Sequence, residues 1–496
     1  MQNLTQGSPT KLIATFATPI LLGAIFQQVY AFIDAAVVGR FLGVGSLAAV
    51  GSPGSLVFLL MGLSWGGSAG LAIPIARAFG AGDLAAVRRF AAAGTYVSVG
   101  IAAFITIVGT VFARDLLTLM NTPPEILDES TIFLTTLLGG AAATVALNFL
   151  IATIRALGDS RTPLYFLVGS SGLNAVLVTA LVGGAGWGVA GAAAATVLSH
   201  LVTVIALLFV IRRRMPALQL RREDWIDGRA SLAEPLRIGI PMGLQMSTIA
   251  VGTLSVQVAV NGMGATTVAA YTAVLRLDNL AVVPLMAFGV AMVTYVAQNR
   301  GAHQWRRIRV GVFRTCLVGA GVAVVLGFSL MFTAPTIAGW FVGSDQAQVL
   351  DYTRTFFLVN GGLYAILSTL FILRNAVQGM GLASVPTIAS LGETLARVLA
   401  ALVLVTNFGF VGVALAAPLA WLGGLIPIGH AWLRQLGKLK RLEAEQDAGL
   451  AVLPLSDDLN LSLLDSGLLD LSGIDTTDAF GPSADPRPTT RELALA

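Results

Sequence analysis

The chain has 496 residues, of which 56% are hydrophobic and only 11% are charged, with a formal net charge of +4. Soluble domains carry roughly 25% charged residues, so this composition excludes a soluble globular protein and indicates a chain that folds within a lipid bilayer. The single cysteine, Cys316, excludes an intramolecular disulfide framework and provides no spacing typical of a metal site.

The charges are unevenly distributed along the sequence. The segment 443–496 contains 11 acidic residues and only two arginines, so the rest of the chain is strongly basic. A basic excess in a membrane protein is typical of cytoplasmic loops. No basic stretch is interleaved with aromatic residues, so the sequence does not indicate nucleic-acid binding.

Apolar runs separated by polar breaks predict twelve membrane spans, because a helix needs about 20 apolar residues to cross a hydrocarbon layer of about 30 Å. In the first half the predicted spans lie near 12–38, 54–76, 91–113, 132–154, 163–183 and 188–211. In the second half they lie near 236–260, 279–297, 310–333, 355–373, 385–405 and 411–433. The first run is too long for a signal-peptide core and has no clear cleavage site, so it is read as a span.

Arginine and lysine residues fall on alternate connections between these spans. Examples are Arg77, Arg161 and Arg300, whereas intervening connections such as Gly183–Trp187 are short and uncharged. Basic loops face the cytoplasm in membrane proteins. The alternation therefore supports twelve spans independently of hydropathy, and it predicts a multi-pass protein of the cell (inner) membrane with both termini in the cytoplasm.

The polar stretch 212–235 divides the predicted spans into two sets of six. We expect an N-terminal lobe at 1–211, a cytoplasmic linker at 212–235 and a C-terminal lobe at 236–442. The acidic segment 443–496 mixes leucine with serine, glycine and aspartate, and it is expected to be a disordered cytoplasmic tail.

The two halves resemble each other in sequence. A shift of 221 residues places Gly43–Ala49 over Gly264–Ala270 and Gly188 over Gly409. Since each half has an even number of spans, both begin on the same face of the membrane. We therefore expect a pseudo-two-fold axis along the membrane normal, with a substrate site between the halves near the midplane.

Glycines recur at intervals of four in the second span, at Gly62, Gly66 and Gly70. Small residues at this spacing allow helix backbones to approach closely in lipid. Close packing is one interpretation of the pattern, and a hinge is the other.

Few acidic residues lie within the apolar runs, and Asp34 of the first span is one of them. Tyr30 lies one helical turn earlier, and Gln27 lies on the same face of the helix. A charge at the bilayer centre costs roughly 2.5–3.5 kcal/mol on insertion scales, so an intramembrane carboxylate is a candidate functional group that faces a cavity. A carboxyl group that loads and releases a proton there is the minimum needed to couple transport to a proton gradient. The alternative is an aspartate that caps the end of the span.

Other polar residues within the spans each have two interpretations. Glu393 and Arg397 are four residues apart in the eleventh span, a spacing that favours an ion pair with a structural or a gating role. His200 is interpreted as a proton relay or as a hydrogen-bonded core residue. Arg276 and Asp278 open the predicted eighth span, where they pair with each other or lie at the membrane interface.

The sequence contains no arrangement of serine, histidine and acid, no Walker loop and no cluster of histidine and cysteine. It therefore predicts neither an enzyme nor an ATP-driven pump. No cofactor is expected apart from a coupling ion.

Several stretches, in this order over twelve predicted spans, resemble the multidrug and toxic compound extrusion (MATE) transporters across residues 10–440. They are Tyr30–Gly43, Leu47–Gly51, Arg77–Asp83, Arg155–Pro163, Gly188–Thr196, Gln378–Gly381 and Ala417–Trp421. The resemblance implies an all-α membrane fold of two six-helix lobes in a V-shaped arrangement. It also implies antiport of amphipathic, often cationic, small-molecule drugs against protons or sodium by alternating access.

The resemblance further assigns Asp34 as the coupling carboxylate. It places Asn148, Asn174 and Thr196 in a polar cage around Asp34, together with Tyr30. This chain departs from many relatives at Val178, where they carry a second aspartate. The stretches around Ile249 and Leu367, which align with sodium-binding acids of other relatives, are apolar.

One carboxylate favours protons over sodium, because hard cations prefer several oxygen ligands. Sodium at Asp34 stays the alternative. Two further readings remain: a flippase for a lipid-linked precursor, and a membrane scaffold or receptor that transports nothing. A monomer is expected.

Overall fold

The computed structural model describes residues 3–342 and 346–448, and within these ranges the chain forms helices and short connections without any β-strand. The helices of the first half are α1 (Pro9–Gly51), α2 (Gly54–Gly80), α3 (Leu84–Val111), α4 (Ala113–Leu119), α5 (Pro124–Gly139), α6 (Ala141–Ala156), α7 (Arg161–Val178) with the π-helical η1 (Thr179–Gly184), and α8 (Gly188–Arg214). The connection between the halves contains the short η2 (Pro216–Leu218) and α9 (Arg222–Ala230).

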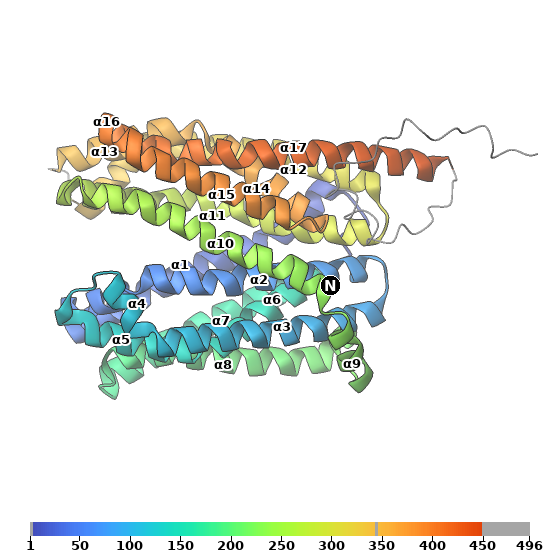
Figure 1. Cartoon of the computed structure of the whole chain (residues 1–496), viewed down its shortest axis with the longest axis horizontal. Helices are drawn as coiled ribbons and strands as arrows, with labels where there is room; N and C mark the ends of the chain where they lie inside the picture. The colour runs from blue at the N-terminus through green and yellow to red at the C-terminus, as the bar shows by residue number, and fades with distance from the viewer. Residues whose placement is uncertain (1–2, 343–345, 449–496) are drawn as a thin grey trace, which may run out of the picture. The chain divides into compact units, whose positions relative to one another are not determined.

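The second half begins at α10 (Ala233–Asn261). It continues with α11 (Ala265–Gly301), α12 (Trp305–Val342), α13 (Ala347–Gly361), α14 (Tyr364–Gly379), α15 (Ser384–Leu399) with the π-helical η3 (Ala400–Leu404), α16 (Val405–Phe408) and α17 (Phe410–Asp447). In Figure 1 the helices of the first half, in blue to green, and those of the second half, in green to red, gather in two bundles.

Ten described helices are long and apolar enough to cross a membrane. Two further pairs pass the same test when each pair is taken as one span, although a bend of 48° separates α5 from α6 and a bend of 53° separates α13 from α14. The predicted spans near 132–154 and 355–373 fall on these bent pairs. The predicted number of twelve agrees with the structure when each bent pair counts as one span.

The first span ends later than the sequence suggested, and the second starts earlier. The element α1 is broken at Gly43, where φ is 87°. The first apolar span therefore runs from Pro9 to Gly43, and the second runs from Gly45 through the end of α1 and along α2. A left-handed φ costs other residues roughly 1–2 kcal/mol, and glycine adopts it freely. The glycines therefore allow a turn so tight that hydropathy alone does not reveal it.

The predicted linker at 212–235 is folded against the first half. Asp224 of α9 forms an ion pair with Arg88 of α3, with 3.2 Å between the carboxylate and Nε. Gly228 of α9 lies directly against α3 at Ala92. The expected tail at 443–496 begins inside α17, which continues to Asp447, and its remainder from residue 449 lies outside the described residues.

The halves contact each other most closely through α2 and α10. A Cβ atom at Gly70 would lie 2.7 Å from the Cα of Gly239, and one at Gly66 would overlap the carbonyl group of Met242. Gly62 faces the same helix at Met246. The glycines at intervals of four therefore permit close packing between the halves, the first of the two interpretations.

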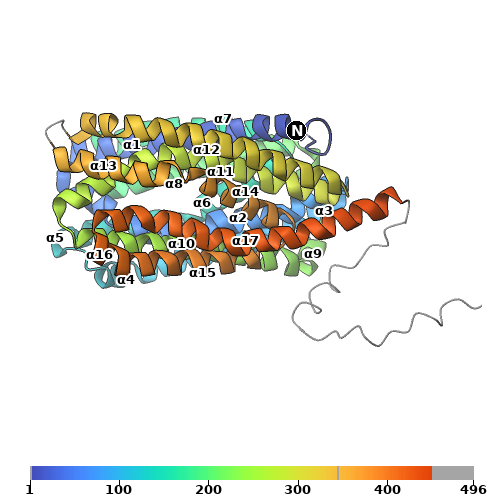
Figure 2. The same ribbon diagram turned by 90° about the horizontal axis from the view of Figure 1, so that it is seen from above.

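The first helix also contacts the second half, as Figure 2 shows for α1 beside α11 and α12. Near its start, α1 contributes to an apolar cluster with these helices, in which Ile13 and Phe16 are buried. Leu4 is completely buried in the same cluster. The helix that carries Asp34 is therefore held at its N-terminal end by side chains of the other half.

Candidate functional site

Asp34 lies in α1 nine residues before the turn at Gly43. The residue is half-buried, and its Oδ1 atom is shielded from solvent without a hydrogen-bond partner. Buried polar atoms in folded proteins are almost always hydrogen-bonded. Within the described residues, Asp34 therefore provides an acceptor that no side-chain or backbone donor fills.

Tyr30, Asn174 and Thr196 are joined by hydrogen bonds across three helices. The hydroxyl groups of Tyr30 in α1 and Thr196 in α8 lie 3.1 Å apart, and Nδ2 of Asn174 in α7 donates to the Thr196 hydroxyl at 3.3 Å. Thr196 donates its own proton to the Ala192 carbonyl at 3.4 Å. A hydroxyl group has one proton, so Tyr30 donates to Thr196.

This arrangement directs the available donors toward Thr196, and Asp34 does not receive them. Oδ1 of Asn174 is likewise buried without a partner. The polar cage expected around Asp34 thus has three of its members bonded to one another, and two carboxyl or amide oxygens are left as free acceptors. Such a set accepts a proton or a cation more readily than an anion.

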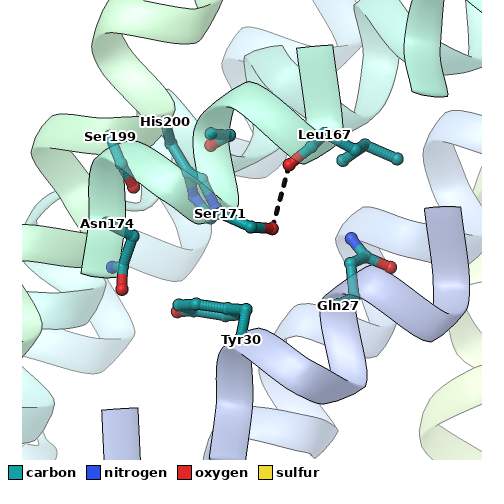
Figure 3. A pocket seen from close by; sticks show the side chains of 8 residues that line it. Gln27, Tyr30, Leu167, Ser171, Asn174, Ser199 and His200 are labelled. Atoms are coloured by element: carbon teal, nitrogen blue, oxygen red, sulfur yellow. Dashed lines mark hydrogen bonds between the residues drawn. The ribbon is translucent and has the colours of Figure 1, made fainter. Parts of the chain in front are cut away.

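A small polar cavity borders this network. It is lined by Gln27, Tyr30, Leu167, Ser170, Ser171, Asn174, Ser199 and His200. Figure 3 shows Gln27 and Tyr30 of α1 facing Asn174 and Ser171 of α7 and His200 of α8 across this space. The cavity volume of about 30 Å³ accommodates water but is far below the 300–1,000 Å³ of drug-sized pockets. Its size suits a water molecule beside the network.

His200 has features of both interpretations. Its Nδ1 atom lies 2.9 Å from the hydroxyl of Thr144 in α6, so the ring is anchored by a hydrogen bond. The same ring lines the polar cavity. The hydrogen bond accounts for a core role, and the position of the ring at the cavity leaves the proton-relay interpretation a prediction.

Asn148 lies apart from this network. Its Nδ2 atom donates to the hydroxyl of Ser64 in α2 at 3.1 Å. The reason is geometric, because α6 packs against α2 and presents Asn148 to it. Val178, where many relatives carry an aspartate, is completely buried in an apolar cluster.

Glu393 has a different partner from the one expected. It forms a buried ion pair with Arg374 of α14, whereas Nη1 of Arg397 is buried without a hydrogen-bond partner. The contacting ion pair of Glu393 is thus with Arg374, while Arg397 still interacts electrostatically with Glu393. Their spacing places them on one face of α15, but the cation on the neighbouring helix is closer to the carboxylate.

Arg374 lies just beyond the predicted tenth span, which ends at residue 373, and it was therefore not among the predicted site residues. The helix α14 continues to Gly379, so Arg374 lies inside it with 5% of its surface exposed. The apolar Ala376 and Val377 that follow Arg374 were the available sequence signal that the helix continues.

Asp278 also lies deeper than expected. Because α11 begins at Ala265, Asp278 is inside the span Thr266–Gly301 and not at its start. Its Oδ1 atom accepts a hydrogen bond from the hydroxyl of Tyr364 at 2.6 Å. The guanidinium group of Arg276 lies 5.3 Å from the ring centroid of Phe32 in α1, so Arg276 contacts the other half of the protein.

Comparison with known proteins gives a family for this architecture. The MatE family model matches residues 19–179 and again residues 241–408, once in each half, which agrees with the predicted internal repeat. Two proteins of Bacillus subtilis strain 168 are similar. The probable multidrug resistance protein YoeA is 30% identical over 66% of this chain and 72% of its own length. The probable multidrug resistance protein YpnP is 29% identical over 62% of this chain and 68% of its own length.

The fold is also similar to that of a solved structure, described as a crystal structure of MATE in complex with MaL6. The TM-score is 0.81 at 24% identity, over 88% of this chain and 99% of the other. The apolar helices, the two halves and the family match agree with one another. The chain is a multi-pass α-helical membrane protein that belongs to the MATE family.

Proposed function

We propose that this protein is a multidrug exporter of the cell membrane that exchanges amphipathic, often cationic, drugs for protons, with both termini in the cytoplasm. The observation that carries the proposal is the half-buried carboxyl group of Asp34 in an apolar helix, whose shielded Oδ1 atom has no hydrogen-bond donor among the described residues. A buried carboxylate without a partner is costly in lipid. A reversible proton on this group supplies a reason for its presence.

The coupling follows from the difference between the two protonation states. When Asp34 is charged, it attracts a cationic drug and the positive end of any nearby hydrogen-bond donor. When a proton neutralises it, that attraction is lost and the drug is released on the outer side. The small polar cavity beside Tyr30 gives water a place near the network. A membrane potential of 100 mV contributes about 2.3 kcal/mol for each charge that crosses.

Protons are favoured over sodium because of the oxygen atoms that this site offers. Hard cations prefer several oxygen ligands, and here one carboxylate is accompanied by the free amide oxygen of Asn174 and the hydroxyl of Tyr30. Val178 and the stretches around Ile249 and Leu367 are apolar. The family resemblance implies acidic residues at these places in other relatives. Sodium at the same atoms is the competing assignment.

The test is ethidium efflux from cells that express the wild type, Asp34→Asn or Asp128→Asn. Asp128 is the matched control because it lies at the surface in an exposed pair with Arg114. We expect wild-type and control efflux that stops with an uncoupler and does not change with sodium, and no efflux by the Asp34 variant. Efflux that depends on sodium would identify sodium, and not the proton, as the coupling ion. Unchanged efflux by Asp34→Asn would remove Asp34 from the mechanism, and wild-type cells that export no cationic dye would favour the flippase.

A further inference from the structure

The second half contains a buried carboxyl group of its own, which the proposed coupling through Asp34 does not use. Asp278 of α11 accepts a hydrogen bond from Tyr364 at 2.6 Å. Tyr364 is completely buried, and its ring lies 5.9 Å from that of Trp421 in α17. The tyrosine is held firmly, so the position of the carboxyl group is well defined within this half.

The charged and titratable groups that face Asp278 are few. From α14 it is faced by Tyr364, and from its own helix by Tyr271, which in turn interacts with Arg397 of α15. Asp278 has no ion pair within the described part of the chain, because Arg276 lies over Phe32 and Arg374 is paired with Glu393. The carboxylate therefore has one strong donor and no neighbouring cation.

Tyr364 is also the first residue of α14, immediately after the 53° bend that separates this helix from α13. The phenol stabilises a charged carboxylate, because a hydrogen bond to a charged group is stronger than one between neutral groups. Burial without a paired cation favours the neutral carboxyl group instead, because a buried charge is costly. The two effects oppose each other, so both protonation states are accessible at this position.

The helices that carry the two carboxyl groups touch beside them. The guanidinium group of Arg276, two residues before Asp278, lies 5.3 Å from the ring centroid of Phe32, two residues before Asp34. Both acids therefore lie near the same contact between the halves.

We propose that Asp278, held by Tyr364, is a second proton-binding site, so that each half of the transporter loads and releases one proton during the cycle. The coupling part of this inference rests on the proposed export function. Proton binding itself is a property of the purified protein and does not require transport. The two can therefore be tested separately.

The first experiment is a pH titration of the carboxyl bands of the purified full-length protein by infrared difference spectroscopy. We compare the wild type with Asp34→Asn, Asp278→Asn and the double variant, and we add Asp278→Glu as a conservative replacement. We expect each single asparagine variant to lose one titrating carboxyl group, the double variant to lose two, and Asp278→Glu to keep both. A spectrum of Asp278→Asn identical to that of the wild type would overturn the proposal. Asparagine retains an oxygen that accepts from Tyr364, which favours correct folding.

The second experiment counts protons per ethidium in proteoliposomes. We expect this ratio to fall by half in Asp278→Asn, whereas the surface variant Asp128→Asn keeps the wild-type ratio. An unchanged ratio in Asp278→Asn would refute a coupling role for the second site while leaving the export function intact. Absence of ethidium transport by the wild type would refute the export function, and the titration would still decide whether Asp278 binds a proton.

Discussion

Replacing Gly66 with alanine tests whether the contact between α2 and α10 controls the opening of the protein. The added methyl group would overlap the carbonyl oxygen of Met242 and lie 3.0 Å from the Cα of Gly243. Both are backbone atoms, so the two helices must move apart. Overpacking of this kind costs about 1–3 kcal/mol, and it applies only to conformations in which the helices touch.

Such a cost shifts the balance between conformations by about 5- to 150-fold, since 1.4 kcal/mol is a factor of ten. Beyond this contact, at the basic end of α2, Gly80 lies against Gln298 of α11. The positive-inside rule predicts that this end faces the cytoplasm. We therefore expect Gly66→Ala to favour conformations that are open toward the cytoplasm.

Spin labels at the exposed positions Ala85 and Gln304 report the separation of the halves at this end, in a background in which Cys316 is serine. Gly66→Ala should increase the population with the longer distance at least fivefold and slow ethidium efflux. Gly100→Ala is the control, because a Cβ atom at Gly100 meets open space. A distance distribution in Gly66→Ala that matches that of the control would show that close contact of α2 and α10 is not what closes this end.

Three further outcomes are expected. Glu393→Gln leaves the buried charge of Arg374 without a counter-ion, so it should destabilise the protein by about 3–5 kcal/mol and lower its thermal unfolding midpoint, whereas a variant of the exposed pair at Asp128 should change it little. Gln298→Leu removes the hydrogen bond that Gln298 accepts from the Leu4 amide and the one that it donates to the Ala156 carbonyl of α6, and the same spin labels should report a wider separation at the basic end. Thr196→Ala removes the acceptor shared by two donors and should reduce proton-coupled efflux, and Thr196→Ser should restore it. An alanine variant as active as the serine variant would contradict a role for that network.

The number of spans could be predicted because hydropathy and loop charge report on the same physical requirement. Each crossing needs about 20 apolar residues, and positive residues remain on one side. The prediction of Asp34 rests on equally local information, since a carboxylate within an apolar run is visible without knowing its neighbours. The repeat was visible because turn glycines such as Gly43 and Gly264, both with positive φ, recur at a fixed interval.

Partners across helices could not be predicted in this way. The spacing of Glu393 and Arg397 describes one face of one helix, while the choice of Arg374 depends on how α14 lies against α15. The depth of Asp278 depended on the start of α11, and the polar side chains near residue 265 concealed that start. Both errors concern the ends and rotations of helices, which tertiary packing decides.

The two halves share one helical pattern, yet their buried polar groups differ in hydrogen bonding. In the first half, donors bond to Thr196 and leave acceptors on Asp34 and Asn174 free beside a water-sized cavity. In the second half, the buried acids already have partners, Arg374 for Glu393 and Tyr364 for Asp278. A free acceptor responds directly to an arriving proton, whereas a bonded carboxyl group must exchange a partner to do so. We therefore expect the first half to respond first to a change in proton concentration, and the second half to follow through the movement of α11 against α14.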